Sequence, residues 1–307
     1  MVNAAPAYLF AGQGSQYPGM GKDLYEAFPQ SRAVFDKADK VLGFSLTRLC
    51  FEGPPEELTK TQNCQPAILT VSIAAFEAFR SRVKGQGLRA KFMAGLSLGE
   101  YSALIAAGAF TFEAGLKLVR TRAEIMDEAT RRHPGTMAAV LDLDIEKVKD
   151  ICLKSGAEIA NINAPGQIVI SGNKEAVDKA TQMCVEAGAK RVIELEVSGA
   201  FHSSLMFEAS AELKQALQNT PISALLVPVV SNYTASMQST ATEIEQNLVY
   251  QLYKPVRWVE SMQYMLSQGV YKFYEFGPGK VLKGLMRRID STVEVINIEK
   301  KEDILAE

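Results

Sequence analysis

The sequence predicts an α/β fold in which a large domain built on a parallel sheet is interrupted by a small α+β unit. Three observations predict it. Short apolar segments at 7–10 and 92–95 are typical of buried strands, and both run into glycine-containing turns. The order of expected elements changes near position 134 and changes back near 199. The length of 307 residues is sufficient for a large core without disulfides or metal.

In the large domain, strands and helices alternate on both sides of the insert. A glycine-rich turn covers 11–21, and Thr111 is the expected N-cap of a helix. We expect strands at 7–10, 92–95, 226–231 and 273–276, and helices at 21–42, 66–83, 98–108 and 112–130. This domain would comprise residues 1–133 and 199–307.

The intervening residues 134–198 predict a different architecture. Asp144 and Asn173 are the expected N-caps of its two helices. The expected order is strand 137–143, helix 145–155, strand 158–163, strand 167–171, helix 174–187 and strand 190–197. The order β-α-β-β-α-β is typical of a ferredoxin-like unit, so we expect a small ferredoxin-like subdomain here.

Composition narrows the classes of function. The net charge is −2 with both signs mixed, so no basic run suggests nucleic acid as a partner. No apolar run approaches 18 residues and no leader is evident, so we expect no membrane segment and a cytoplasmic location. The four cysteines form no CxxC pair and no histidine lies at ligand spacing, which favours buried thiols in a reducing compartment over a metal site.

A candidate nucleophile, Ser97, lies in the G-L-S-L-G segment at 95–99. A sharp strand-to-helix turn with flanking glycines exposes the serine hydroxyl and puts it at a helix N-terminus. The N–H of Leu98 could then stabilise an oxyanion. The alternative interpretation is a tight turn in which the serine only caps the helix.

Such a serine needs a general base, and the chain has two histidines. His133 lies in a polar turn at the expected domain junction. His202 follows the last strand of the insert, where the chain re-enters the large domain and a cleft is expected. Position therefore favours His202, although either could be a surface or capping histidine. No acidic third member can be placed.

Several segments together carry a resemblance to the malonyl-CoA:acyl carrier protein transacylases of bacterial fatty acid synthesis. They occur in family order over nearly the whole chain: FAGQGSQ at 10–16, QPA at 65–67, GLSLGEYSAL at 95–104, NINAPGQ at 161–167, GAFHS at 199–203, QLYKPVRW at 251–258 and GPGKVL at 277–282. The resemblance implies a hydrolase-like core with a ferredoxin-like insert.

The resemblance also implies residue roles. Ser97 would be the acylated nucleophile and His202 its base. Gln13 and Leu98 would supply the two oxyanion-hole N–H groups. Gln251 would orient His202, through its backbone carbonyl, which accounts for the missing acid. Substrate-binding roles follow for Arg122, Met126, Phe201 and Asn163.

Arg122 matches the family's arginine for the free malonyl carboxylate, and its planar fork suits that partner. Arg122 lies at one edge of the apolar stripe of its helix and Arg120 at the other, so the two cannot share a site. Helix geometry alone leaves open a surface arginine that only covers apolar neighbours. The stripe consists of Phe112, Leu116, Val119, Ala123 and Met126.

Two positions bear on acyl choice. Leu96 stands where the family usually has histidine, which removes a polar group beside the acyl pocket and leaves its effect on selectivity open. Phe201 resembles the malonyl-selecting form, whose ring would crowd a 2-methyl branch. Excluding one methyl group is worth only about 1–3 kcal/mol, so that selectivity would be incomplete.

The implied function is transfer of malonyl from malonyl-CoA to a holo acyl carrier protein through a Ser97 ester, without cofactor or metal, by an enzyme expected to be monomeric. A polyketide-synthase acyltransferase, an acyl-thioester hydrolase and a non-catalytic binding protein are the alternatives. A basic docking surface for the acidic carrier could include Lys190, Arg191, Lys280, Lys283, Arg287 and Arg288.

Overall fold

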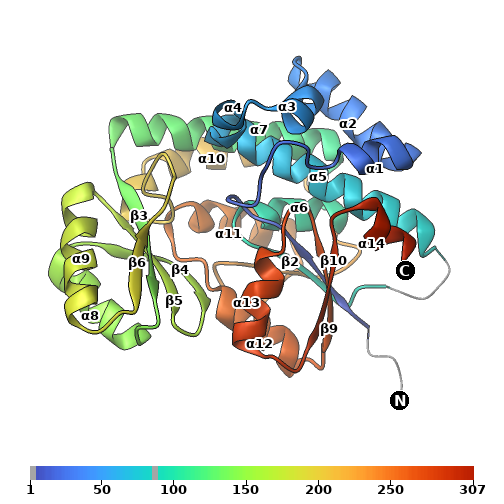
Figure 1. Cartoon of the computed structure of the whole chain (residues 1–307). Helices are drawn as coiled ribbons and strands as arrows, with labels where there is room; N and C mark the ends of the chain where they lie inside the picture. Colours follow the sequence, from blue (N-terminus) through green and yellow to red (C-terminus); the bar gives the residue numbers. More distant parts are fainter. Residues whose placement is uncertain (1–4, 85–88) are drawn as a thin grey trace.

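The computed structural model describes residues 5–84 and 89–307. The first four residues, on which the expectation about a leader partly depends, lie outside the described part. The chain forms a mixed α/β structure with two separate sheets, which lie side by side in Figure 1. Among the described residues, no helix combines the length and apolar character needed to cross a membrane.

The larger sheet has six strands in the order β10-β9-β1-β2-β7-β8. All neighbouring pairs are parallel except β7 and β8, which are antiparallel. The strands are β1 (Ala7–Phe10), β2 (Phe92–Gly95), β7 (Val229–Val230), β8 (Met237–Gln238), β9 (Lys272–Phe276) and β10 (Glu294–Ile298).

Helices cover both faces of this sheet, as its alternating apolar side chains require. Tyr8 and Phe10 of β1 contribute to the core beneath α5, whereas Leu9 contributes to the core beneath α12 and α13. The helices of the large domain are α1 (Lys22–Ala27), α2 (Pro29–Leu42), α3 (Leu46–Glu52), α4 (Pro55–Thr59), α5 (Thr61–Arg82), α6 (Leu98–Ala106), α7 (Phe112–Arg132), the short 3-10 helix η1 (Ser204–Met206), α10 (Ala209–Gln218), α11 (Ala241–Tyr253), α12 (Trp258–Ser267), α13 (Val281–Ile289) and α14 (Lys301–Leu305).

The smaller sheet is antiparallel, with the strand order β4-β5-β3-β6. Its helices α8 and α9 lie on its outer side in Figure 1. Val256 exchanges backbone hydrogen bonds with Ala160 and Ile162 of β4, which fastens this sheet to the large domain. The elements are β3 (Thr136–Leu141), α8 (Ile145–Ser155), β4 (Glu158–Ala164), β5 (Gln167–Gly172), α9 (Lys174–Glu186) and β6 (Arg191–Glu194).

Several expected elements differ from the structure. The helix expected at 21–42 is two helices, because the residue before a proline avoids helical backbone and Phe28, before Pro29, is extended. The strand expected at 226–231 is only Val229–Val230, since Pro228 cannot donate to a neighbouring strand. The strand expected at 190–197 is shortened to Arg191–Glu194.

Helix α5 begins at Thr61, before the expected start at 66, and carries Pro66 in its interior. A proline there lacks the N–H that would bond the carbonyl four residues earlier. That carbonyl, of Gln62, instead accepts a 2.8 Å hydrogen bond from Arg120 Nη1. The side chain on α7 thus satisfies the group that the proline leaves free.

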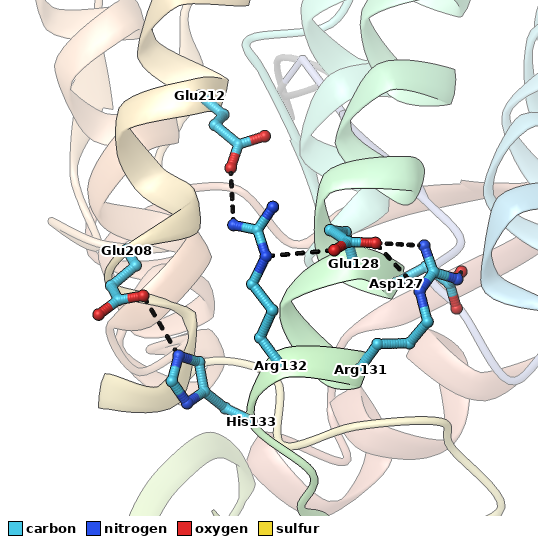
Figure 2. A network of polar contacts seen from close by, with 7 residues as sticks. All are labelled: Asp127, Glu128, Arg131, Arg132, His133, Glu208 and Glu212. Atoms are coloured by element: carbon cyan, nitrogen blue, oxygen red, sulfur yellow. Dashed lines mark hydrogen bonds and ion pairs between the residues drawn. The ribbon is translucent and has the colours of Figure 1, made fainter.

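The end of α7 is joined to the segment that follows the small sheet by a surface network, shown in Figure 2. Arg132 contacts Glu128 of its own helix and Glu212 of α10, at 3.2 and 3.3 Å. The neighbouring His133 contacts Glu208 at 3.2 Å. These exposed pairs contribute little stability individually, but they bring together the two chain segments that border the insert.

Glycines allow α6 to lie directly against the sheet. A methyl group on Gly99 would come within 2.1 Å of the Phe10 carbonyl oxygen, and one on Gly95 within 2.0 Å of the Gly99 carbonyl carbon. Backbone therefore contacts backbone where β1, β2 and α6 meet.

We expect Gly99→Ala to lower the free energy of unfolding by about 1–3 kcal/mol or more, because neither backbone can retreat. Gly284→Ala is the matched control, since a methyl group there meets nothing within 4 Å. That exposed change within α13 should instead stabilise by about 0.5–1 kcal/mol. Urea unfolding of both variants measures this, and equal stabilities would contradict the close-contact argument.

Candidate active site

Ser97 occupies the turn between β2 and α6 in a strained conformation, with φ 51° and ψ −102°. Such a backbone costs on the order of 1–3 kcal/mol and persists only when its surroundings impose it. Ser97 N–H donates to Asn232 Oδ1 at 2.7 Å, and the N–H of Leu96 donates to the Phe10 carbonyl at 3.3 Å. The turn is therefore held from both sides.

His202 lies against this serine. Its Nε2 is 2.9 Å from Ser97 Oγ, and its Nδ1 is 2.7 Å from the backbone carbonyl of Gln251. A carbonyl can only accept, so Nδ1 carries the proton and Nε2 is free to accept the serine proton. The ring is thus in the tautomer that a general base requires.

The surroundings of His202 favour its neutral form. The side chain is buried and its backbone has a positive φ of 56°. Burial and, to a smaller extent, the positive charge of Arg122 lower its pKa to about 4, although the hydrogen bond to Gln251 opposes the shift. The imidazole is therefore available as a base well below neutral pH.

Arg122 of α7 is 1% exposed and points at the same serine. Its Nη1 donates to Gln65 Oε1 at 2.7 Å, and its Nη2 lies 3.2 Å from Ser97 Oγ and 3.3 Å from Gln251 Oε1. The guanidinium also lies over the Tyr101 ring, 5.2 Å from its centroid. No carboxylate of the described residues is hydrogen-bonded to this buried cation, which is therefore suited to an anionic substrate group.

Gln65 of α5 joins two further predicted residues to this arginine. Its Nε2 lies 3.5 Å from Gln13 Oε1 and 3.4 Å from Met126 Sδ. Gln13 and Met126 therefore border the same polar cluster as Arg122.

Backbone donors lie close to the serine. Leu98 is the first residue of α6, so its N–H has no acceptor within the helix. A methyl group on Gly12 would come within 2.5 Å of the Leu96 carbonyl oxygen, so the loop carrying Gln13 approaches the nucleophile turn closely. The N–H of Ser97 itself is taken by Asn232, which leaves Leu98 and Gln13 as candidate oxyanion donors.

The remaining predicted residues are placed less directly. Phe201 is buried next to His202 in the chain. Asn163 is buried on β4, and among the described residues its Oδ1 has no hydrogen-bond partner. His133 is partly exposed and bound to Glu208, as Figure 2 shows.

The expected basic surface is partly engaged in structural contacts. Arg288 Nη2 contacts Asp142 at 2.8 Å, and Lys190 Nζ contacts the same carboxylate at 3.7 Å. The Arg288 pair connects α13 to the small sheet and the Lys190 pair lies within the insert, so both side chains are less available to a partner.

Sequence reasoning missed four residues that contact the site: Gln65, Tyr101, Glu100 and Asn232. The first three lie in segments that carried the family resemblance, but no chemical role drew attention to them. Asn232 directly follows the strand expected at 226–231, and residues at the carboxyl ends of parallel strands are where sites form. That placement was the available signal.

A serine on a strained strand-to-helix turn, a buried neutral histidine and nearby backbone N–H donors form a site for moving acyl groups through a serine ester. The comparisons agree with this class. Residues 7–297 match the family described as acyl transferase domain. The chain is 47% identical to the malonyl CoA-acyl carrier protein transacylase of Bacillus subtilis (strain 168), over 97% of this chain and 94% of that protein. It belongs to this family of transacylases.

Solved structures show the same relationship. An acyl-carrier-protein-S-malonyltransferase from Bartonella henselae superposes with a TM-score of 0.95 at 40% identity, covering 99% of this chain and 98% of that one. A malonyl-transacylase in complex with a type II PKS acyl-carrier protein superposes with a TM-score of 0.94 at 39% identity, with 99% and 98% covered.

The low pKa of His202 predicts an unusual pH dependence. The neutral ring is the base and exists above its pKa, so reaction of Ser97 with a fluorophosphonate probe should stay constant from pH 8 to about 5 and fall only toward pH 4. An unperturbed histidine would lose half its activity near its usual pKa of about 6.5.

Stopped-time labelling across this range measures the effect. His133→Ala is the control and should give the same profile, whereas Ser97→Ala should not be labelled. A decline centred near pH 6.5 would show that burial does not control the base.

Proposed function

We propose that this chain transfers a malonyl group from malonyl-CoA to the phosphopantetheine thiol of a holo acyl carrier protein in fatty acid biosynthesis. The observation that carries the proposal is the convergence of Arg122 Nη2 and His202 Nε2 on Ser97 Oγ, at 3.2 and 2.9 Å. One group activates a nucleophile, and the other offers a charge to the acyl group that the nucleophile would carry. Family membership supports the same reaction.

In the first half-reaction, Ser97 Oγ attacks the thioester carbon while His202 Nε2 takes its proton. The C–O bond forms, and the N–H groups of Leu98 and Gln13 hold the resulting oxyanion. Collapse of this intermediate breaks the C–S bond. His202 returns its proton to the departing sulfur, and coenzyme A leaves as a thiol.

The second half-reaction reverses these steps with a different thiol. The phosphopantetheine sulfur attacks the Ser97 ester, His202 takes the thiol proton, and the same donors hold the oxyanion. Breaking the ester bond returns the proton to Ser97 Oγ. Gln251 keeps His202 in the required tautomer through both halves by accepting from Nδ1.

Arg122 would select a carboxylated acyl group. A malonyl ester is short, so its free carboxylate stays near Ser97, where the guanidinium can bind it through two parallel hydrogen bonds. An acetyl group lacks that partner. Met126, Phe201 and Asn163 are proposed to line the acyl pocket, and the unpartnered Asn163 Oδ1 is free to accept from substrate.

The architecture is proposed to be a hydrolase-like core, residues 1–133 and 199–307, with a ferredoxin-like subdomain at 134–198. Two observations support this: Ser97 follows a strand of the mostly parallel large sheet, and the insert has the antiparallel strand order β4-β5-β3-β6. The enzyme is proposed to be a monomer. Four free, buried cysteines suit the reducing cytoplasm.

The pathway has a second candidate, because a related structure contains a type II PKS acyl-carrier protein. A discrete polyketide acyltransferase would use the same chemistry with another carrier. Part of the basic set proposed for docking remains open to such a partner: Arg191, Lys280, Lys283 and Arg287.

We expect radiolabelled malonyl-CoA to label the wild-type protein covalently and Ser97→Ala not at all, because the ester forms on Ser97 Oγ. Holo carrier proteins from both pathways are then added in parallel, and the one that removes label faster identifies the pathway. Release mainly as free malonate would favour a hydrolase. Absence of label from any acyl-CoA would reopen the interpretation as a binding protein.

Arg122→Ala should lower kcat/KM for malonyl transfer by about 10²–10³-fold, because a buried, hydrogen-bonded charge pair is lost. Acetyl labelling of Ser97 should change far less. Arg120→Ala is the matched control on the same helix, since Arg120 bonds Glu124 and the Gln62 carbonyl instead. Steady-state rates with both acyl-CoAs measure this, and unchanged malonyl transfer would disprove the assigned role.

A further inference from the structure

Among the described residues, no acid contacts the side chain of Ser97 or His202, yet one buried carboxylate contacts residues that in turn contact both. Glu100 is in the first turn of α6, three residues after Ser97, and is completely buried. Its Oε2 accepts from the Asn232 N–H at 3.0 Å and from Gln251 Nε2 at 2.8 Å. Its Oε1 accepts from Gln238 Nε2 at 2.8 Å.

Both Oε2 partners also contact the reacting residues. Asn232 Oδ1 accepts the Ser97 N–H, and its Nδ2 donates to the Gly95 carbonyl at 2.8 Å. Gln251 donates from Nε2 to the Ser97 carbonyl at 3.0 Å, and its own backbone carbonyl accepts from His202 Nδ1. The carboxylate thus holds the two residues that hold the nucleophile and the base.

A further contact closes the network. Asn247 Nδ2 donates to Gln238 Oε1 at 2.9 Å. Asn247 and Gln251 lie one turn apart on α11, so that helix reaches Glu100 both directly and through Gln238. Networks in which every group is satisfied fix one arrangement of a core, whereas partial satisfaction is costly.

Burial raises the pKa of Glu100, and the hydrogen bonds from its three donors and the charge of Arg122 oppose this by favouring the carboxylate. All three partners donate, and an ionised carboxylate only accepts. A glutamine would present its own N–H groups to at least one of these donors. Helix α6 also favours a negative charge in its first turn.

We infer that Glu100 is a positioning residue for the acyl transfer: it fixes Gln251 and Asn232, and through them the tautomer of His202 and the strained turn of Ser97. This inference rests on the proposed function. Glu100 takes the place of the missing acid, but it acts on the residue that supports the histidine and does not touch the histidine itself.

The test compares Glu100→Gln with Glu275→Gln. Glu275 is also completely buried and accepts two backbone hydrogen bonds, from Leu282 and Lys283 of α13, but has no contact with the site. We expect kcat for malonyl transfer to fall about 10²-fold in Glu100→Gln, as expected for misplaced reacting groups. KM should stay within about threefold, and Glu275→Gln should keep kcat within about threefold.

A second measurement separates positioning from general destabilisation. The chain has two histidines, so ¹⁵N-histidine NMR resolves His202, with His133→Ala for assignment. Wild type should show the Nδ1–H tautomer, and Glu100→Gln should shift toward a mixture. If Glu100→Gln does not fold, Gln238→Met removes one donor to Glu100 and should shift the tautomer in the same direction.

Unchanged kcat in folded Glu100→Gln would overturn the inference. So would a lower kcat with an unchanged tautomer, because Glu100 would then act in another way. If the wild-type protein transfers no malonyl group, the proposed function fails, and the tautomer comparison still decides whether Glu100 positions His202.

Discussion

The buried charge of Arg122 is the constraint on which the rest of the site depends. A guanidinium out of water must be surrounded by acceptors, and its neighbours are the amide oxygens of Gln65 and Gln251 and the hydroxyl of Ser97. These partners are neutral, so they accept from Nη1 and Nη2 without cancelling the charge, while the buried Nε has no hydrogen-bond partner among the described residues. The same charge helps to keep His202 neutral and favours negative charge on Ser97 Oγ. One side chain therefore acts on the base and the nucleophile together and, under the proposed function, on the substrate as well.

The packing around the site maintains the strained backbone conformations of Ser97 and His202. Ser97 and His202 both have positive φ, and neither is glycine. The serine turn cannot relax toward the sheet, because Gly99 of α6 already brings its backbone against β1. Nor can it relax outward, because Asn232 binds its N–H and Gln251 its carbonyl. The rigidity of the large sheet is thus transmitted to the reacting hydroxyl.

Much of this could be predicted from the sequence, but only where the signal was local. The two-sheet organisation follows from the order of apolar segments, and Ser97 from its glycine-flanked turn. The division of the first helical segment at Pro29 could also have been predicted, because the residue before a proline avoids helical backbone. Glu100 was not, because a glutamate in the first turn of a helix looks like an ordinary solvent-exposed residue. Its burial depends on Asn232 and Gln251, which lie 132 and 151 residues further along the chain.

The Gln251 side-chain amide lies between Glu100 and Arg122. This arrangement allows the site to bind a substrate carboxylate and to keep a neutral histidine as the base. A carboxylate in direct contact with Arg122 would occupy the place that a malonyl carboxylate needs. A carboxylate on His202 Nδ1 would favour the imidazolium in the resting enzyme and lower the supply of neutral base. With Gln251 between them, Glu100 fixes the geometry of both residues while its oxygens accept from other donors. Arg122 stays available to the substrate, and His202 stays neutral until it takes the serine proton.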